Sequence, residues 1–190
     1  MIADKMKNMV ANSSAIRAMF EEGNRLAGIY GAALHGYTNS NCGYAEVRAA
    51  VAKSLNERFD THFEGKNIVM TVGAAGGLNV ILKAIINPGD EVIAFAPYFG
   101  EYRSYTNNYE LAAIMEAKQK EFGTDIVLIS DEPYRELAYD GVEVPYLTKY
   151  YDNTVVGYSY SKSLSLPGER IGYLVIPDEM KDSEEVLSAA

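Results

Sequence analysis

The chain has 190 residues, of which 48% are apolar and 23% charged, so it is long enough to bury a hydrophobic core and too apolar to be disordered. Its net charge of −9 argues against nucleic acid as a main partner, and no apolar run approaches the ~20 residues that span a bilayer. The first residues lack the apolar stretch of a signal peptide and Cys42 is the single cysteine, so we expect a cytoplasmic protein without an internal disulfide.

The predicted elements alternate between helices and strands. In chain order they are a helix from about residue 12 to 31, a helix over 44–59, a strand over 67–72, a helix over 78–86, a strand over 91–96, a helix over 111–122, strands over 125–130, 154–159 and 171–176, and the beginning of a helix over 178–190. The helices show apolar residues at steps of three and four, and the strands are short β-rich or continuous apolar runs. This alternation predicts an α/β domain with a largely parallel sheet.

Ligands of α/β sheets bind beyond the carboxyl ends of the strands, so the residues that follow each strand are the first candidates for a site. The first strand leads into Gly73-Ala74-Ala75-Gly76-Gly77 at a helix start. Small residues let backbone N–H groups approach a phosphate there, and the helix dipole favours the anion. A tight strand-to-helix turn explains this segment equally well. It has neither the Lys-Ser or Lys-Thr of a Walker loop nor the spacing of the dinucleotide fingerprint.

Three further strand ends carry aromatic, acidic and basic residues. The second strand is followed by Pro97-Tyr98-Phe99, whose aromatic rings either stack on a planar cofactor or pack in the core. The third ends in Asp131, which is equally compatible with a helix cap or a surface acid. The fourth leads into Lys162, which lies between two serines and ahead of Arg170. A phosphate cradle, an aromatic plate, an acid and a lysine together predict a pyridoxal phosphate site.

At this point the sequence resembles the class I and II aminotransferases. The most specific match is Ser159-x-Ser161-Lys162, followed eight residues after the lysine by Arg170 within Leu166-Pro167-Gly168-Glu169-Arg170-Ile171-Gly172. The resemblance implies that Lys162 forms the Schiff base with pyridoxal 5'-phosphate, and that Ser159 and Arg170 bind its phosphate. The other residues that match the family's cofactor site are Gly73, Ala74 and Ala75 (phosphate loop), Phe99 (ring stacking), Asp131 (pyridine nitrogen), Tyr134 (ring hydroxyl) and Tyr37 (phosphate, from the neighbouring subunit).

The same resemblance implies a fold and a reaction. The fold is that of the large domain of fold-type-I pyridoxal-phosphate-dependent transferases, an α/β/α sandwich around a mostly parallel sheet. We expect an N-terminal helical arm at 1–31, the cofactor-binding large domain at 32–177 and the start of a small domain at 178–190. Lys162, Asp131 and Tyr134 are the expected catalytic residues of a homodimeric aminotransferase that moves an amino group between an amino acid and a 2-keto acid, with aspartate slightly favoured. No metal site is expected.

The sequence also departs from the family pattern. It has no Asn-Pro-x-Gly segment ahead of the Asp131 strand, and the arginine that binds the substrate carboxylate is not found. One helical pattern passes directly into another between Tyr109 and Glu110, and a similar jump occurs near Gly31-Ala32. The alternatives are therefore another fold-type-I activity (a carbon–sulfur lyase, a decarboxylase or an aminocyclopropane-carboxylate synthase), a relative that binds the cofactor without turnover, or a phosphate-binding α/β domain without pyridoxal.

Overall fold

The computed structural model describes residues 2–7, 41–93 and 108–190. Its helices and strands are α3 (Ala45–Phe59), β1 (Ile68–Val72), α4 (Gly73–Ile85), α5 (Asn108–Phe122), β2 (Leu128–Asp131), β3 (Thr154–Ser159), α6 (Tyr160–Ser163), β4 (Ile171–Val175) and α7 (Ser183–Ala189). Short 3₁₀ turns are η1 (Gly65–Asn67), η3 (Arg135–Leu137) and η4 (Leu147–Lys149). Within these described ranges, no helix is long and apolar enough to cross a membrane.

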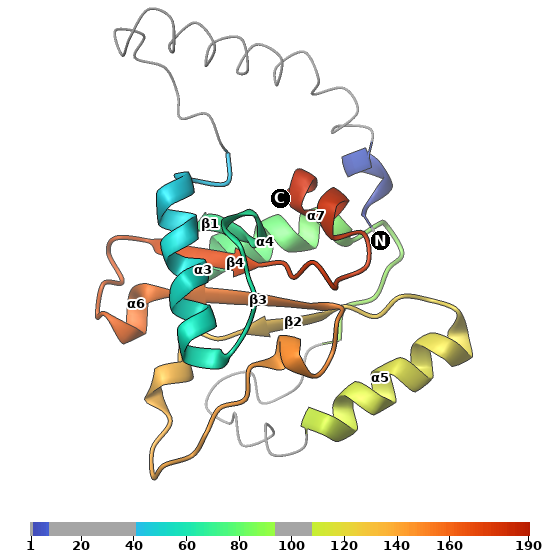
Figure 1. The fold of residues 1–190 in the computed structure, drawn as a ribbon. Helices are drawn as coiled ribbons and strands as arrows, with labels where there is room; N and C mark the ends of the chain where they lie inside the picture. Colours follow the sequence, from blue (N-terminus) through green and yellow to red (C-terminus); the bar gives the residue numbers. More distant parts are fainter. Residues whose placement is uncertain (1, 8–40, 94–107) are drawn as a thin grey trace, which may run out of the picture.

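The four strands of the described residues form one mixed sheet in the order β1-β4-β3-β2 (Figure 1). β2 pairs with β3 in parallel, whereas β4 is antiparallel to both β1 and β3. Three of the four strands therefore run in one direction and β4 alone is reversed. The expected α/β fold is confirmed, but the described sheet is mixed, because the reversed β4 makes antiparallel pairs with both of its neighbours.

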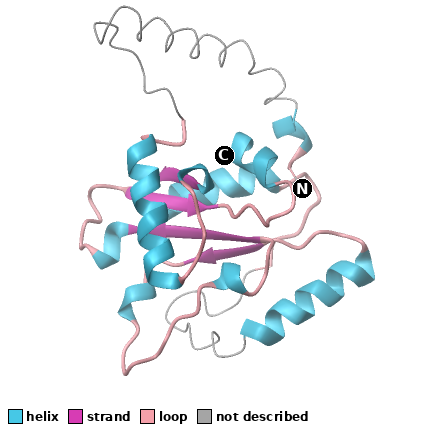
Figure 2. Cartoon of the chain, in the orientation of Figure 1, coloured by secondary structure: helices cyan, strands magenta, loops and turns pink. Residues whose placement is uncertain are grey.

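Helices cover both faces of the sheet (Figure 2). On one face, Leu55 of α3 belongs to a buried cluster with Val156 and Tyr173 of the sheet. On the other face, Ile81 of α4 and Val186 of α7 belong to a second cluster with the strand residues Val69, Val155 and Leu174 and with Ile176, which directly follows β4. The sheet is thus the middle layer of an α/β/α sandwich. β3 is buried along its whole length, as expected of a strand covered on both sides.

Besides shifts at the ends of helices and the short helix α6, which the sequence did not predict, the observed elements differ from the predicted ones in three places. Residues 91–93 are not in a strand, and Val92 and Ile93 are exposed, so the strand expected over 91–96 is wrong in its described part; residues 94–96 lie outside the described ranges. The strand expected over 125–130 begins only at Leu128 and extends to Asp131. The glycine-rich segment after β1 is the first turn of α4, so this helix begins at Gly73.

The two ends of the described chain lie close together on the α4 side of the sheet (Figure 1). Ile2, Ala3 and Met6 form a small cluster with Ala189, and the backbone N–H of Ala3 donates to the carbonyl of Ala84. The predicted helix over 12–31 lies outside the described residues. The division of the chain at 31–32 and 177–178 stays a prediction.

Candidate active site

The reversed direction of β4 brings four chain segments to one edge of the sheet. The carboxyl ends of β1, β2 and β3 lie at this edge because the three strands are parallel, and the amino end of β4 joins them because that strand runs the other way. Ser159 pairs with Gly172, and Val72 pairs with Ile171. The segments that the sequence singled out therefore meet here, with the exception of those outside the described residues.

Gly73 and Arg170 form the part of the edge where an anion is expected to bind. Gly73 has a φ of 69°, and a Cβ built on it would lie 2.8 Å from Nη2 of Arg170. The guanidinium thus lies directly against the first turn of α4. This helix has no side-chain cap at its N-terminus, so its first N–H groups remain available to an anion. Thr71 steadies the turn, because its hydroxyl donates to the Gly73 carbonyl at 2.9 Å.

Gly172 allows β4 to approach this turn closely. A Cβ on Gly172 would lie 2.9 Å from the Gly73 Cα and 2.5 Å from the Tyr158 carbonyl oxygen. Any side chain at this position would push β4 away from α4. The backbone of Arg170 is also unusual, since its φ of 52° lies in the left-handed region that favours glycine. The arginine is thereby held at a strained position beside the α4 N-terminus.

Ser159 joins this edge to the lysine helix. Its hydroxyl accepts a hydrogen bond from the Ser161 backbone N–H at 3.2 Å and lies 2.7 Å from the Ser161 hydroxyl, so it caps α6. Because Ser159 is buried and paired with Gly172, the cap is fixed to the sheet. The Ser-x-Ser motif consequently sets where α6 begins and where its third residue, Lys162, projects.

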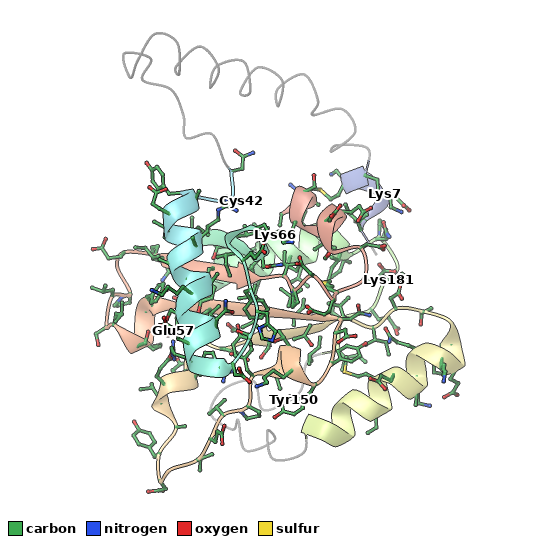
Figure 3. All side chains as sticks on the ribbon, in the orientation of Figure 1. Lys7, Cys42, Glu57, Lys66, Tyr150 and Lys181 are labelled. Carbon is green, nitrogen blue, oxygen red and sulfur yellow. The ribbon has the colours of Figure 1, made fainter. Side chains whose placement is uncertain are left out.

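Lys162 and Tyr134 meet across the edge. The Lys162 ammonium lies 5.1 Å from the centre of the Tyr134 ring, at a cation–π distance. Both Lys162 and Lys181 are exposed, and Lys181 is ion-paired with Asp125 at 2.8 Å. Figure 3 shows Lys181 at the opposite end of the sheet from α6. These two lysines therefore have different surroundings, and only Lys162 lies at the edge with Arg170.

Asp131 ends β2 opposite Gly157 of β3. Burial raises the pKa of its carboxyl group above the ordinary value. A protonated ring nitrogen beside such a carboxylate would offset the cost of its ionisation, because a neighbouring positive charge favours the charged form of an acid. This is the chemistry that a pyridinium requires from its acidic partner.

The structure places most of the predicted site residues together. Gly73, Ser159, Lys162, Arg170, Asp131 and Tyr134 lie at the carboxyl edge of the sheet or directly after it, and Ala74 and Ala75 lie in the first turn of α4. Tyr37 and Phe99 lie outside the described residues. Sequence reasoning assigned no role to Thr71, and it included Gly172 in the matching motif without its packing role, because the hydroxyl contact of one and the close backbone approach of the other appear only in the folded chain.

The donor set fits pyridoxal phosphate. Arg170, Ser159 and the uncapped N-terminus of α4 offer a cation, a hydroxyl and N–H groups for a phosphate, and Asp131 and Lys162 offer an acid and an amine for the ring and its aldehyde.

Comparisons with known proteins agree with this geometry. The family described as aminotransferase class I and II matches residues 13–126 and 105–190. The chain belongs to this family. Among solved structures, an amino transferase from Eubacterium rectale is 35% identical with a TM-score of 0.66, and the match covers 87% of this chain and 55% of that one. Aspartate aminotransferase from Thermus thermophilus with maleate is 21% identical with a TM-score of 0.62, and the match covers 90% and 55% of the two chains. The fold is therefore that of fold-type-I transferases.

The aminotransferase family members are longer than this chain. The putative aminotransferase YugH of Bacillus subtilis is 26% identical over an alignment of 199 residues that covers 78% of this chain and 52% of the relative. The aspartate aminotransferase of Pyrococcus horikoshii is 24% identical, and the alignment covers 74% and 48%. The chain thus spans about half the length of the curated relatives it matches. Since the YugH alignment is longer than the whole chain, that relative has internal residues that this chain lacks.

Proposed function

We propose that this chain carries the cofactor-binding half of a pyridoxal-phosphate-dependent aminotransferase, which moves an amino group between an amino acid and a 2-keto acid. The observation that carries the proposal is the meeting of Lys162, Tyr134 and the Gly73–Arg170 pair at one edge of the sheet. Family membership supports the reaction class. Aspartate is the first amino acid to test, because several relatives are named aspartate aminotransferase.

Each residue of the edge has a distinct task in this proposal. When bound, the cofactor supplies an aldehyde that links covalently to an amine and a ring that withdraws electrons. Arg170, Ser159 and the first turn of α4 hold the phosphate and so fix the orientation of the ring. The Lys162 amine would bind the aldehyde and, after a substrate amine has replaced it there, its Nζ would take up the proton of the substrate α-carbon. An ionised Asp131 would keep the ring nitrogen protonated, and Tyr134 would donate to the ring hydroxyl.

The test is to locate the covalent bond between protein and cofactor. The purified chain is incubated with pyridoxal phosphate, reduced with borohydride and mapped by peptide mass spectrometry. We expect the adduct on Lys162, with loss of the adduct in Lys162→Ala and its retention in Lys181→Ala, because Lys181 lies at the far end of the sheet in an ion pair with Asp125. An adduct on Lys149 or Lys181 in place of Lys162 would overturn the assignment.

A second measurement separates transamination from other fold-type-I reactions. An aminotransferase converts its cofactor to the amine form when an amino acid alone is added, whereas a lyase or a decarboxylase releases product with the cofactor unchanged. The absorption spectrum of the loaded protein before and after addition of aspartate or alanine distinguishes these outcomes. A spectrum that stays constant with every amino acid would favour a relative that binds the cofactor without turnover.

The assembly and the location of the protein also belong to this proposal. We propose a homodimer in the cytoplasm, in which Tyr37 reaches the phosphate of the neighbouring site. We further propose the division into an arm at 1–31, a large domain at 32–177 and the start of a small domain at 178–190. The resemblance of the Gly36-Tyr37 segment to the family supports the first point, and the single Cys42 supports a reducing compartment.

A further inference from the structure

Tyr158 is a buried tyrosine whose hydroxyl contacts the lysine helix. It lies on β3 immediately before Ser159, is 4% exposed and donates a hydrogen bond to the Ser163 hydroxyl at 2.7 Å. Ser163 is the last residue of α6 and directly follows Lys162. α6 is therefore fixed to β3 at both ends, by the Ser159 cap at its start and by the Tyr158 hydroxyl at its finish.

The same hydroxyl is close to the turn that follows Tyr134. Glu136 of η3 forms an ion pair with Arg58 of α3 at 2.6 Å. Burial and the neighbouring Glu136 carboxylate raise the pKa of Tyr158 to about 12, while Ser163 and Arg58 act in the opposite direction. The phenol is thus protonated near neutral pH. It stands between two segments that are far apart in sequence, one with Tyr134 and one with Lys162.

We propose that Tyr158 is a positioning residue that sets the place of Lys162 relative to Tyr134 through its hydrogen bond to Ser163. This role rests on the proposed function, because it matters for catalysis only if Lys162 binds the cofactor. The ring of Tyr158 is already accounted for, since it stacks on Tyr173 with a centroid distance of 5.0 Å and meets the edge of Tyr160 at 5.3 Å. Packing in the core therefore explains why an aromatic ring is present at this position, whereas the hydroxyl makes the contact with α6.

Tyr158→Phe tests the hydroxyl while keeping the ring. Hydrogen exchange followed by mass spectrometry reports on the amides of Leu164 and Ser165, which donate to the carbonyls of Tyr160 and Lys162. We expect these amides to exchange about fivefold faster in the variant, the equivalent of the ~1 kcal/mol that one hydrogen bond contributes. The matched control is Tyr151→Phe, since Tyr151 is also 4% exposed and its hydroxyl donates to the Ile126 carbonyl, away from α6.

Variants of Ser163 show whether the hydrogen bond itself is responsible. Ser163→Ala should reproduce the faster exchange, whereas Ser163→Thr should keep the slow exchange of the unaltered protein because it retains a hydroxyl. Tyr158→Phe combined with Ser163→Ala should exchange no faster than either single variant. Unchanged exchange of the α6 amides in Tyr158→Phe, or equal acceleration in Tyr151→Phe, would overturn the proposal.

A cofactor titration connects the hydrogen bond to the site. In Tyr158→Phe, we expect the pyridoxal phosphate concentration that half-saturates Lys162 to rise about fivefold, with no change in Tyr151→Phe. Faster α6 exchange without any change in this concentration would remove the positioning role. If the unaltered protein forms no adduct on Lys162, the proposed function fails, and the exchange measurement still decides whether Tyr158 holds α6.

Discussion

At the scale of one residue, the partly buried carboxyl group of Asp131 lowers the stability of the folded chain when it ionises. Burial raises its pKa in the folded chain above the value of ~3.9 that an unfolded chain shows. Ionisation therefore occurs first in the unfolded chain as the pH rises, and it favours unfolding. The resulting loss of stability begins as the pH rises above the unfolded pKa and is complete once the pH exceeds the folded pKa.

Asp131→Asn should consequently stabilise the cofactor-free protein near neutral pH and have much less effect near pH ~3, where the carboxyl group is protonated in both states. Urea unfolding at the two pH values measures the difference. The same variant should lower the transamination rate by several powers of ten, at ~1.4 kcal/mol of barrier for each. Equal stability of variant and parent at neutral pH would contradict the first expectation, and near-normal turnover the second.

Gly73 combines a left-handed backbone conformation with a place in the proposed phosphate site. Gly73→Ala places a Cβ 2.8 Å from the Arg170 guanidinium, whereas at Gly89, also in the left-handed region with a φ of 100°, a Cβ meets nothing within 4 Å. Both substitutions should cost about 1–2 kcal/mol of stability through backbone strain. Only Gly73→Ala should also weaken pyridoxal phosphate binding, as measured by titration. Similar binding losses in the two variants would show that Arg170 is not displaced.

At the scale of elements, apolar runs predicted β1, β3 and β4 within one residue at each end. They did not predict the direction of β4, because a buried run reads the same for parallel and antiparallel strands. The sequence does contain an indication that β4 is antiparallel to β3, because the connection over 160–170 is shorter than the dozen or more residues that a parallel crossover needs. The motif from Ser159 to Arg170 could be recognised in the sequence. The contacts of Tyr158, Thr71 and Gly172 could not, because they form only in the folded chain.

The turn after β2 is held by a buried ion pair that sequence reasoning also missed. Arg135 pairs with Glu132, and both side chains are about 5% exposed. The guanidinium also donates to the carbonyls of Val144 and Pro145, at 2.7 and 3.0 Å, and lies over the rings of Phe59 and Tyr146. One arginine thus connects the segment of Asp131 and Tyr134 to the loop before η4.

Arg135→Ala should destabilise the protein by about 3–5 kcal/mol, because it leaves the Glu132 carboxylate buried without its cation. Urea unfolding measures this loss. The control is Lys118→Ala, which breaks an exposed i,i+3 pair with Glu121 and should cost less than about 1 kcal/mol. Adding Glu132→Gln to Arg135→Ala should recover part of the stability. A loss as small as that of the control would show that the ion pair does not hold the turn.

At the scale of the whole molecule, the described part supplies one edge of a site. The proposed dimer predicts complementation between two inactive chains. If Tyr37 acts in the neighbouring site, a heterodimer of Lys162→Ala and Tyr37→Phe chains contains one site with both defects and one with neither. Its activity should exceed that of either parent variant. Absence of recovery, once mass measurement has confirmed the heterodimer, would place Tyr37 in its own subunit's site or outside any site.

The position of β4 between β1 and β3 also determines when, during synthesis, the strands can pair. Among the described strands, β1 has β4 as its partner, and the buried contact of Asn67 with the Ile176 carbonyl spans 109 residues. During synthesis, nearly the whole of this segment must be made before β1 can pair with a neighbouring strand, and such distant pairing makes folding slow. A nascent chain that ends before residue 171 lacks β4, the strand that joins β1 to β3 and whose start places Arg170 beside Gly73. The proposed phosphate contacts of Arg170 therefore form only when the sheet closes.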